Sequence, residues 1–311
     1  MRLNWVPLAL ALAWGLNWPA VKILLSVLPP FTLRWLGMGL AALLLAAVAL
    51  AQGRRLRPAL ADLPAITIGG GLTVAAFGVC TALAQLSTST SRAAVLTFTM
   101  PLMAAVLAWA WLAERPGRRG ALALAMGALG IAVLAAPVLQ GRAAAPGGLP
   151  GLPGSPGLPG LPTGLLWPLL AALCWAAGTV AAKRWPAVGD RIALTAWQLA
   201  LGAACTGLGA WGLGEHWPSG WTATVLAVLA FHVLISTALG YVLWWRLLAS
   251  TTATVASLTT LAVPVVGVLG AMALVGDRPS ALDWLGFVLV LAGAGLVLAP
   301  AAPPARHSGA G

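Results

Sequence analysis

Charged residues are scarce in this chain, and acidic residues are the scarcest of them. Only 7% of the 311 residues are Asp, Glu, Lys or Arg, and six are acidic. Soluble globular domains carry about 25% charged residues, so a soluble domain of this length is excluded. No acidic residue is expected deep inside an apolar run, so no buried carboxylate relay for protons is predicted. The six are Asp62, Glu114, Asp190, Glu215, Asp277 and Asp283.

Cysteine is also rare, with three residues at Cys80, Cys174 and Cys205. All three lie inside apolar runs and lack the spacing of metal ligands, so we interpret them as small buried hydrophobic residues. Neither a disulfide framework nor a catalytic cysteine is predicted. The apolar runs contain no HExxH motif, carboxylate pair or nucleophile–base pair, which argues against a membrane-embedded enzyme.

Hydrophobic residues, in contrast, make up 60% of the chain, and the mean hydropathy is +0.95. The apolar runs are about twenty residues long, enough for a helix to cross a hydrocarbon core of roughly 30 Å. The sequence therefore predicts an all-α polytopic membrane protein. Ten transmembrane helices are expected, at 3–25, 31–51, 63–86, 93–113, 119–139, 164–184, 192–214, 222–247, 253–275 and 282–302.

One hydrophobic pattern occurs twice in the chain. The segment Trp14–Lys22 recurs as Trp175–Lys183, and single residues recur 163 positions further on (264 − 101), Pro101 as Pro264 and Gly130 as Gly293. Because each copy holds an odd number of helices, five, the two copies must cross the membrane in opposite directions, as inverted repeats do. We therefore predict a first repeat at 1–140, a linker at 141–163, a second repeat at 164–302 and a tail at 303–311.

The net charge of +11 does not indicate nucleic-acid binding, because the basic residues form short clusters between apolar runs. If the N-terminus is cytoplasmic, twelve basic residues fall on the cytoplasmic side and four on the outer side, with Arg34 inside a span left uncounted. This bias predicts that both termini are cytoplasmic. The twelve are Arg2, Arg54, Arg55, Arg57, Arg115, Arg118, Arg119, Lys183, Arg184, Arg191, Arg246 and Arg306, and the four are Lys22, Arg92, Arg142 and Arg278.

Two segments allow other interpretations. The first twenty residues resemble a signal peptide, but they contain the first copy of a repeat whose second copy lies in mid-chain, so cleavage is not expected. Gly148–Pro162 consists of five Gly-Leu-Pro-like triplets. A collagen triple helix needs three chains, so an extended polyproline-like linker between the repeats is the favoured interpretation.

Polar and aromatic residues share one face of the first expected helix. Trp14, Trp18 and Lys22 are spaced four residues apart, within about 80° on a helix with 3.6 residues per turn, and Asn17 lies beside them. The sixth helix repeats the arrangement with Trp175, Thr179 and Lys183. This pattern predicts a cavity that stacks on or surrounds a polar organic molecule. The alternative is that the tryptophans pack between helices and the lysines extend to the membrane surface.

Three further residues in the spans are candidates for function. Arg34 is placed to pair with a substrate carboxylate, or else it extends to the outer surface. Gln198, near the corresponding place in the seventh helix, is a neutral hydrogen-bonding residue. His232 is the ionisable residue expected near the middle of a span, which indicates proton coupling, unless it rests neutral in a local hydrogen bond.

Prolines and acidic residues also occupy matching positions. Pro101 and Pro264 fall inside the fourth and ninth expected helices, which predicts hinges or cavity walls rather than simple packing kinks. Glu114 and Asp277 end those helices. Each precedes Arg-Pro, which favours a local ion pair at the helix end.

Taken together, these residues resemble the drug/metabolite transporter superfamily, and its EamA family in particular. The first copy is similar in its Trp-Gly-x-Asn opening with Lys22, and in Arg34, Pro101 and Glu114. The second copy is similar in Trp175, Lys183, Gln198, Pro264 and Asp277. The second copy departs from the first at Gly178-Thr179, which replace Asn17-Trp18, and the linker is longer than expected.

The resemblance implies a secondary transporter that exports amino acids, related metabolites or drugs across the inner (plasma) membrane by alternating access. It implies a small-molecule substrate and the lipid bilayer as partners, no cofactor or metal, no enzymatic activity, and a monomer or homodimer. The alternatives are an exchanger of phosphorylated sugars or nucleotide sugars, which needs several converging basic residues, and a membrane-embedded enzyme.

Overall fold

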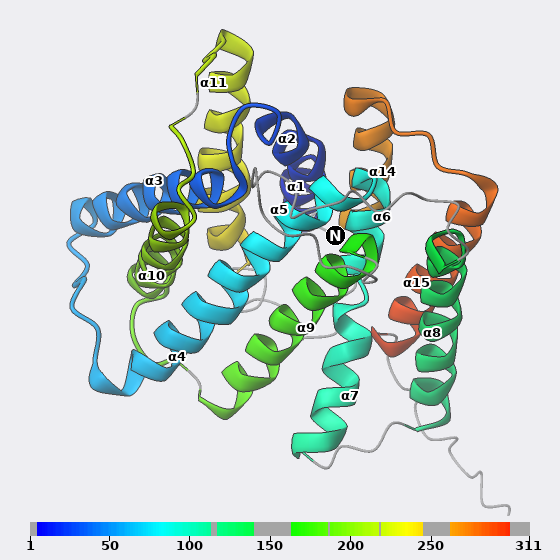
Figure 1. Ribbon diagram of the computed structural model, residues 1–311. Helices are drawn as coiled ribbons and strands as arrows, with labels where there is room; N and C mark the ends of the chain where they lie inside the picture. Colours follow the sequence, from blue (N-terminus) through cyan, green and yellow to red (C-terminus); the bar gives the residue numbers. More distant parts are fainter. Residues whose placement is uncertain are drawn as a thin grey trace, which may run out of the picture.

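The computed structural model describes residues 5–112, 117–139, 163–185, 187–217, 219–244 and 262–298, and every regular element in these ranges is a helix (Figure 1). In the first half of the chain the helices are α1 (Trp5–Gly15), α2 (Asn17–Leu24), α3 (Pro30–Ala51), η1 (Leu60–Asp62), α4 (Leu63–Ile68), η2 (Gly69–Ala76), α5 (Phe77–Ser87), α6 (Thr90–Thr97), α7 (Met100–Leu112) and α8 (Arg118–Leu139). In the second half they are α9 (Thr163–Arg184), α10 (Arg191–Gly212), α11 (Ala223–Ala230), η3 (Phe231–Leu239), α14 (Ala262–Val275) and α15 (Ala281–Leu298).

The described part of each expected span is helical. Seven helices are long and apolar enough to cross a membrane, and three shorter apolar helices extend over Leu8–Leu24, Ala262–Val275 and Ala281–Leu296. The protein is thus a multi-pass helical membrane protein. The exact number of spans and the inversion of the two halves stay predictions. The Gly-Leu-Pro linker, Glu114 and the chain after residue 298 lie outside the described residues.

Two expected spans contain a short irregular stretch, and a proline stands just after each. The first span is irregular at Leu16, between α1 and α2, and the fourth at Phe98–Thr99, between α6 and α7, while each continues as one apolar helix over Leu8–Leu24 and Thr90–Trp111. Pro19 and Pro101 each lie in the first turn of the helix that follows the irregular stretch. Proline is tolerated there because the first backbone N–H groups of a helix have no intrahelical partner.

Two π-helical stretches occupy matching places in the two halves. They are η2 (Gly69–Ala76) and η3 (Phe231–Leu239), whose starts are 162 residues apart (231 − 69). Each lies within a longer helix, in the third and the eighth expected span. The π-helix is rare and is frequently found at functional sites, so both stretches are candidates for such a site.

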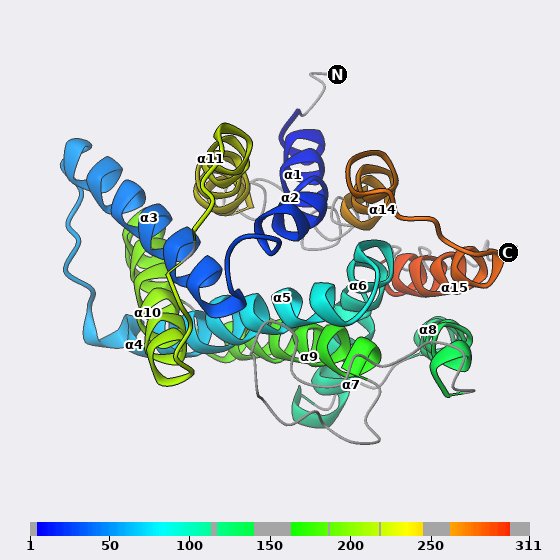
Figure 2. The ribbon, with the colours of Figure 1, turned by 45° about the horizontal axis from the view of Figure 1, so that its top comes forward.

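Helices from the two halves pack against each other throughout the fold. At one end α3 packs along α10, and at the other end α8 packs along α15 (Figures 1 and 2). Between them, α5 packs along α9, and α14 packs against α1, α2 and α6. The halves therefore form one bundle in which the interior is shared.

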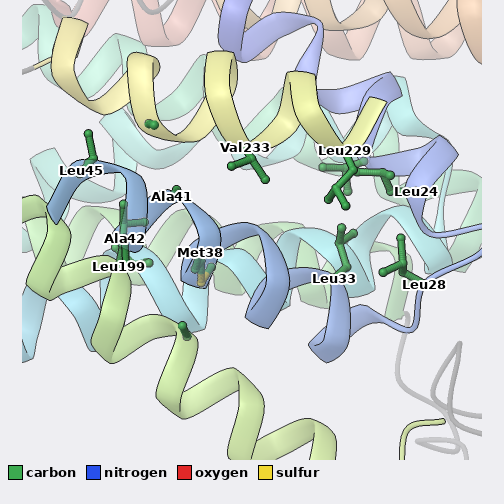
Figure 3. Packing of buried hydrophobic residues seen from close by; sticks show 14 of the residues in the cluster. Leu24, Leu28, Leu33, Met38, Ala41, Ala42, Leu45, Leu199, Leu229 and Val233 are labelled. Carbon is green, nitrogen blue, oxygen red and sulfur yellow. The ribbon is translucent and has the colours of Figure 1, made fainter. Parts of the chain in front are cut away.

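The largest hydrophobic cluster joins α2, α3, α10, α11 and η3. Leu24, Leu28 and Leu33 line one end of it, and Met38 packs near its middle (Figure 3). Leu199 comes from α10, and Leu229 with Val233 comes from α11 and η3. This cluster holds α3 between helices of the second half, and α3 carries Arg34.

Glycine brings α8 and α15 into close contact. A Cβ atom on Gly293 would lie 2.8 Å from the Ala123 carbonyl oxygen, and one on Gly130 would lie 2.9 Å from the Val290 nitrogen. Both neighbours are backbone atoms, which cannot rotate away. The matching glycines seen in the sequence therefore serve helix packing, as small residues do in membranes.

We expect Gly293→Ala to lower the free energy of unfolding by about 1–3 kcal/mol, the usual cost of overpacking an interior. Thermal unfolding of the purified protein in detergent measures the effect. Gly71→Ala is the matched control, because a Cβ atom at Gly71 meets nothing within 4 Å. Equal melting temperatures for the two variants would contradict the close contact.

Candidate functional site

Arg34 is a buried cation without a carboxylate partner in the described residues. Its side chain is 6% exposed, its Nη2 donates to Thr81 Oγ1 at 3.0 Å, and its Nε has no hydrogen-bond partner. Gly78 on α5 faces this side chain, and a Cβ atom there would lie 3.4 Å from Arg34 Cδ. Burying an unpaired charge costs several kcal/mol, so this guanidinium calls for an anionic partner.

The described carboxylates do not pair with Arg34; they form hydrogen bonds or ion pairs with other residues, most of them at helix ends. Glu215 accepts hydrogen bonds from the backbone N–H groups of Phe31 and Thr32 and from the Thr32 hydroxyl, at 2.6–3.0 Å. It thereby satisfies the first turn of α3, where orphan N–H groups favour a negative charge. Asp62 Oδ1 accepts from the N–H groups of Val188 and Gly189.

The loop after α14 carries the next carboxylate. Asp277 accepts from the N–H and hydroxyl of Ser91, at 2.8 and 2.9 Å, instead of pairing with the neighbouring Arg278 as its position suggested. Asp283 pairs with Arg92. These contacts tie the start of α6 to the loop after α14 and to the first turn of α15.

Asp190 begins α10 and forms an ion pair with Arg54. Burial alone would raise the pKa of Asp190, but the N–H groups of Ala193 and Ile192 together with the Arg54 guanidinium outweigh it and lower the pKa below its usual value. The charge on Asp190 is therefore present at neutral pH. Its stabilising contacts are lost only as the pH falls below the ordinary range of an aspartate.

His232, on the π-helical stretch η3, lies beside Arg34. It is 3% exposed, and its Nδ1 donates to Asn17 Oδ1 at 2.7 Å. Its ring packs on Gly37 of α3, where a Cβ atom would lie 2.7 Å from Nε2. Arg34 interacts electrostatically with His232 and also with Tyr241. The structure therefore brings together Arg34, Asn17 and His232, three of the residues predicted from the sequence.

An aromatic cluster adjoins this polar group. Trp14 is central, with ring centroids 6.1 Å from Trp175, 6.2 Å from Tyr241 and 5.6 Å from Trp244, and Trp175 is 4.8 Å from Phe77. The Trp14 Nε1–H donates to the Ser236 carbonyl at 3.0 Å. All five residues are half-buried, and aromatic rings offer apolar surface on which another group can stack.

Two other residues of the predicted cavity, Trp18 and Lys22, have side chains that lie apart from those of Arg34, Asn17 and His232. Trp18 is buried among Ala84, Ala93 and Ala94 of the neighbouring helices. Lys22 Nζ donates to the Gln85 carbonyl at 2.5 Å and interacts electrostatically with Asp277. Trp18 and Lys22 thus contact α5 and α6 rather than the group around Arg34.

Two predicted residues of the second half lie away from the polar group. Thr179 is exposed, and its hydroxyl donates to the Trp175 carbonyl of its own helix. Gln198 Nε2 donates to the Ala65 carbonyl of α4 at 2.9 Å. The side chain of Lys183 lies outside the described residues. Pro101 is half-buried and Pro264 is buried, each in the first turn of its helix as described, and their role as hinges stays a prediction.

Several residues of the site were not found from the sequence. Thr81 and Ser236 are hydroxyl residues inside apolar runs, and Thr81 is the partner of Arg34. Tyr241 is the only tyrosine of the chain. A unique tyrosine in an apolar run could have been recognised as a site candidate, because a phenol inside a bundle usually has a polar neighbour.

A helical bundle of two interleaved halves, with a buried cation and aromatic rings between them, is the architecture of a membrane transporter. The sequence profile of the EamA-like transporter family matches the chain twice, over residues 4–136 and 162–299. The chain belongs to the EamA-like transporter family. This confirms the resemblance drawn from the sequence.

The proteins similar to this chain include a curated transporter and a solved structure. The "Uncharacterized transporter YvbV" of Bacillus subtilis (strain 168) is 25% identical over 282 residues, which cover 91% of this chain and 86% of that protein. A solved crystal structure of a protein matches with a TM-score of 0.60 and 18% identity, covering 92% of this chain and 94% of the other. At that identity the likeness concerns the fold alone.

Proposed function

We propose that the protein is a secondary active transporter that exports small polar metabolites with a carboxylate group, such as amino acids or drug-like acids, by alternating access. The observation that carries this proposal is Arg34, a buried cation without a carboxylate partner in the described chain, beside half-buried aromatic rings. A guanidinium binds a carboxylate through charge-assisted hydrogen bonds, and the rings provide surface for an apolar body.

Packing supports two inverted repeats. His232 of η3 packs on Gly37 of α3, and Gln198 of α10 packs on Gly69 of η2. Gln198 stands 161 residues after Gly37, and His232 stands 163 after Gly69, so the two contacts between the halves correspond to each other, with the large and small residues exchanged. Such exchange is expected when a two-fold axis in the membrane plane relates the halves, with the substrate bound between them.

The orientation follows from the charge bias. Twelve basic residues against four support cytoplasmic termini in a multi-pass protein of the plasma membrane. In this orientation the site lies nearer the outer surface, because Arg34 is only five residues into α3. The bonds of Glu215 with Thr32 and of Asp277 with Ser91 then close the outer ends of the bundle.

An exchanger of phosphorylated sugars is less well supported. A phosphate dianion favours several cations, yet Lys22 donates to the Gln85 carbonyl near α6 while Arg34 donates to Thr81. The membrane-embedded enzyme has no supporting observation: the described residues hold no group of three or more His, Cys, Asp or Glu that would bind a metal.

Counterflow in proteoliposomes tests the proposed function. A growth-rescue screen with toxic amino acids, their analogues and dyes first identifies a transported compound. Vesicles loaded with that compound are then expected to accumulate its labelled form, while empty vesicles and vesicles without the protein do not. Absence of accumulation for every compound that rescues growth would overturn the proposal.

A further inference from the structure

Helices α5 and α9, which come from different halves, pack antiparallel in a fixed register. Near one end of the contact, Gly178 of α9 packs directly on the Thr73 side chain of η2, which continues into α5. Further along, the rings of Phe77 and Trp175 are 4.8 Å apart. At the far end, a Cβ atom on Gly164 would lie 3.0 Å from the Ser87 carbonyl oxygen. The glycines at both ends hold the two helices close together.

This register brings Cys80 of α5 and Cys174 of α9 within about one helical turn of each other along the contact. Cys80 lies one turn beyond Phe77, and Cys174 directly precedes Trp175, so both thiols belong to the middle of the contact. Cys80 and Cys174 interact with each other, and both are free. Cys80 is buried and Cys174 is half-buried. Two neighbouring thiols on facing helices can form a disulfide when their Cα atoms come within about 7 Å of each other.

We propose that Cys80 and Cys174 form a modification site at which a peroxide oxidises the two thiols to a disulfide between the halves. Cys174, the more accessible thiol, attacks hydrogen peroxide; its sulfur becomes a sulfenic acid and one water is released. Cys80 then attacks that sulfur, the S–O bond breaks, and a second water leaves. Two thiols and one peroxide thus give one disulfide and two waters, and a dithiol reductant reverses the step.

The disulfide acts on the site already described. Cys80 precedes Thr81, which accepts a hydrogen bond from Arg34, and Cys174 precedes Trp175 of the aromatic cluster. A covalent bond here keeps α5 and α9 together and stops relative movement of the halves beside the substrate. This consequence rests on the proposed function, whereas formation of the disulfide does not.

The first experiment measures the disulfide alone. The parent protein carries Cys205→Ser, which removes the exposed third thiol on α10; the controls add Cys80→Ser or Cys174→Ser. After treatment with hydrogen peroxide, the parent is expected to lose both free thiols and to yield a cross-linked peptide by mass spectrometry. Each control is expected to form no intramolecular cross-link. Oxidation of Cys174 to sulfinic acid in the parent, with Cys80 still reduced, would overturn the proposal.

The second experiment measures transport by the same proteins. The oxidised parent is expected to lose counterflow and to regain it with dithiothreitol, while the two controls keep counterflow after peroxide. Full transport by the cross-linked protein would overturn the claim that the disulfide stops relative movement of the halves. Absence of transport before oxidation would count against the proposed function and leave the thiol result standing.

Discussion

Replacing Arg34 with glutamine is expected to weaken the affinity for a carboxylate substrate by about 10- to 100-fold. A hydrogen bond to a charged group contributes about 1.5–3 kcal/mol, and 1.4 kcal/mol corresponds to a factor of ten. The substitution keeps most of the side-chain volume, and the Thr81 hydroxyl still donates to the Gly78 carbonyl. Equilibrium binding of phenylacetate, or of the acid found in the screen, to protein in detergent measures the change.

Two comparisons separate recognition of charge from damage to the fold. Arg55→Gln is the matched control, because Arg55 is exposed in the segment between α3 and η1. Phenylacetamide, the neutral analogue, is expected to bind wild type and Arg34→Gln equally. If Arg34→Gln binds both compounds as wild type does, Arg34 is not the carboxylate-binding group. A preference of wild type for phenyl phosphate over phenylacetate would instead favour a phosphate substrate.

Much of the fold could be predicted because the membrane imposes simple rules. Apolar runs of about twenty residues become helices, since lipid leaves a backbone no other hydrogen-bond partner. The matching of Trp14 with Trp175 and of Gly130 with Gly293 revealed two related halves. Arg34 and His232 stood out because an ionisable residue is costly in a span.

Other features depended on how distant segments meet. Trp14 and Trp18 occupy one face of an ideal helix, but Trp18 packs among Ala84, Ala93 and Ala94, and of the two only Trp14 joins the aromatic cluster. The role of Asp277 depends on Ser91, which is distant in sequence. The proximity of Cys80 to Cys174 depends on the register of α5 and α9, which hydrophobic periodicity does not determine.

The two halves share a framework but not its polar groups. Both contain a π-helical stretch at the same place, yet η3 presents His232 to Gly37 whereas η2 presents Gly69 to Gln198. Asn17, the partner of His232, corresponds to Gly178, which serves packing against Thr73. The polar groups of the candidate site are therefore concentrated between α2, α3 and η3.

His232→Ala is expected to abolish transport driven by a pH gradient and to leave counterflow at equal pH intact. His232 is buried, Asn17 accepts its Nδ1–H, and among the described residues Arg34 interacts with it electrostatically. Histidine is the side chain that most readily exchanges a proton near neutral pH, so its removal uncouples the gradient from substrate movement. Uptake into proteoliposomes with and without an imposed pH gradient measures both quantities.

His216→Ala is the matched control, because His216 is exposed in the segment after α10. Asn17→Leu removes the hydrogen-bond partner but keeps the imidazole, and it is expected to shift the pH dependence rather than abolish it. Retention of gradient-driven uptake by correctly inserted His232→Ala would exclude His232 as the coupling group. Loss of counterflow as well would show that the imidazole holds α2 and η3 together for substrate binding. A selective loss of gradient-driven uptake is the result that proton coupling alone produces.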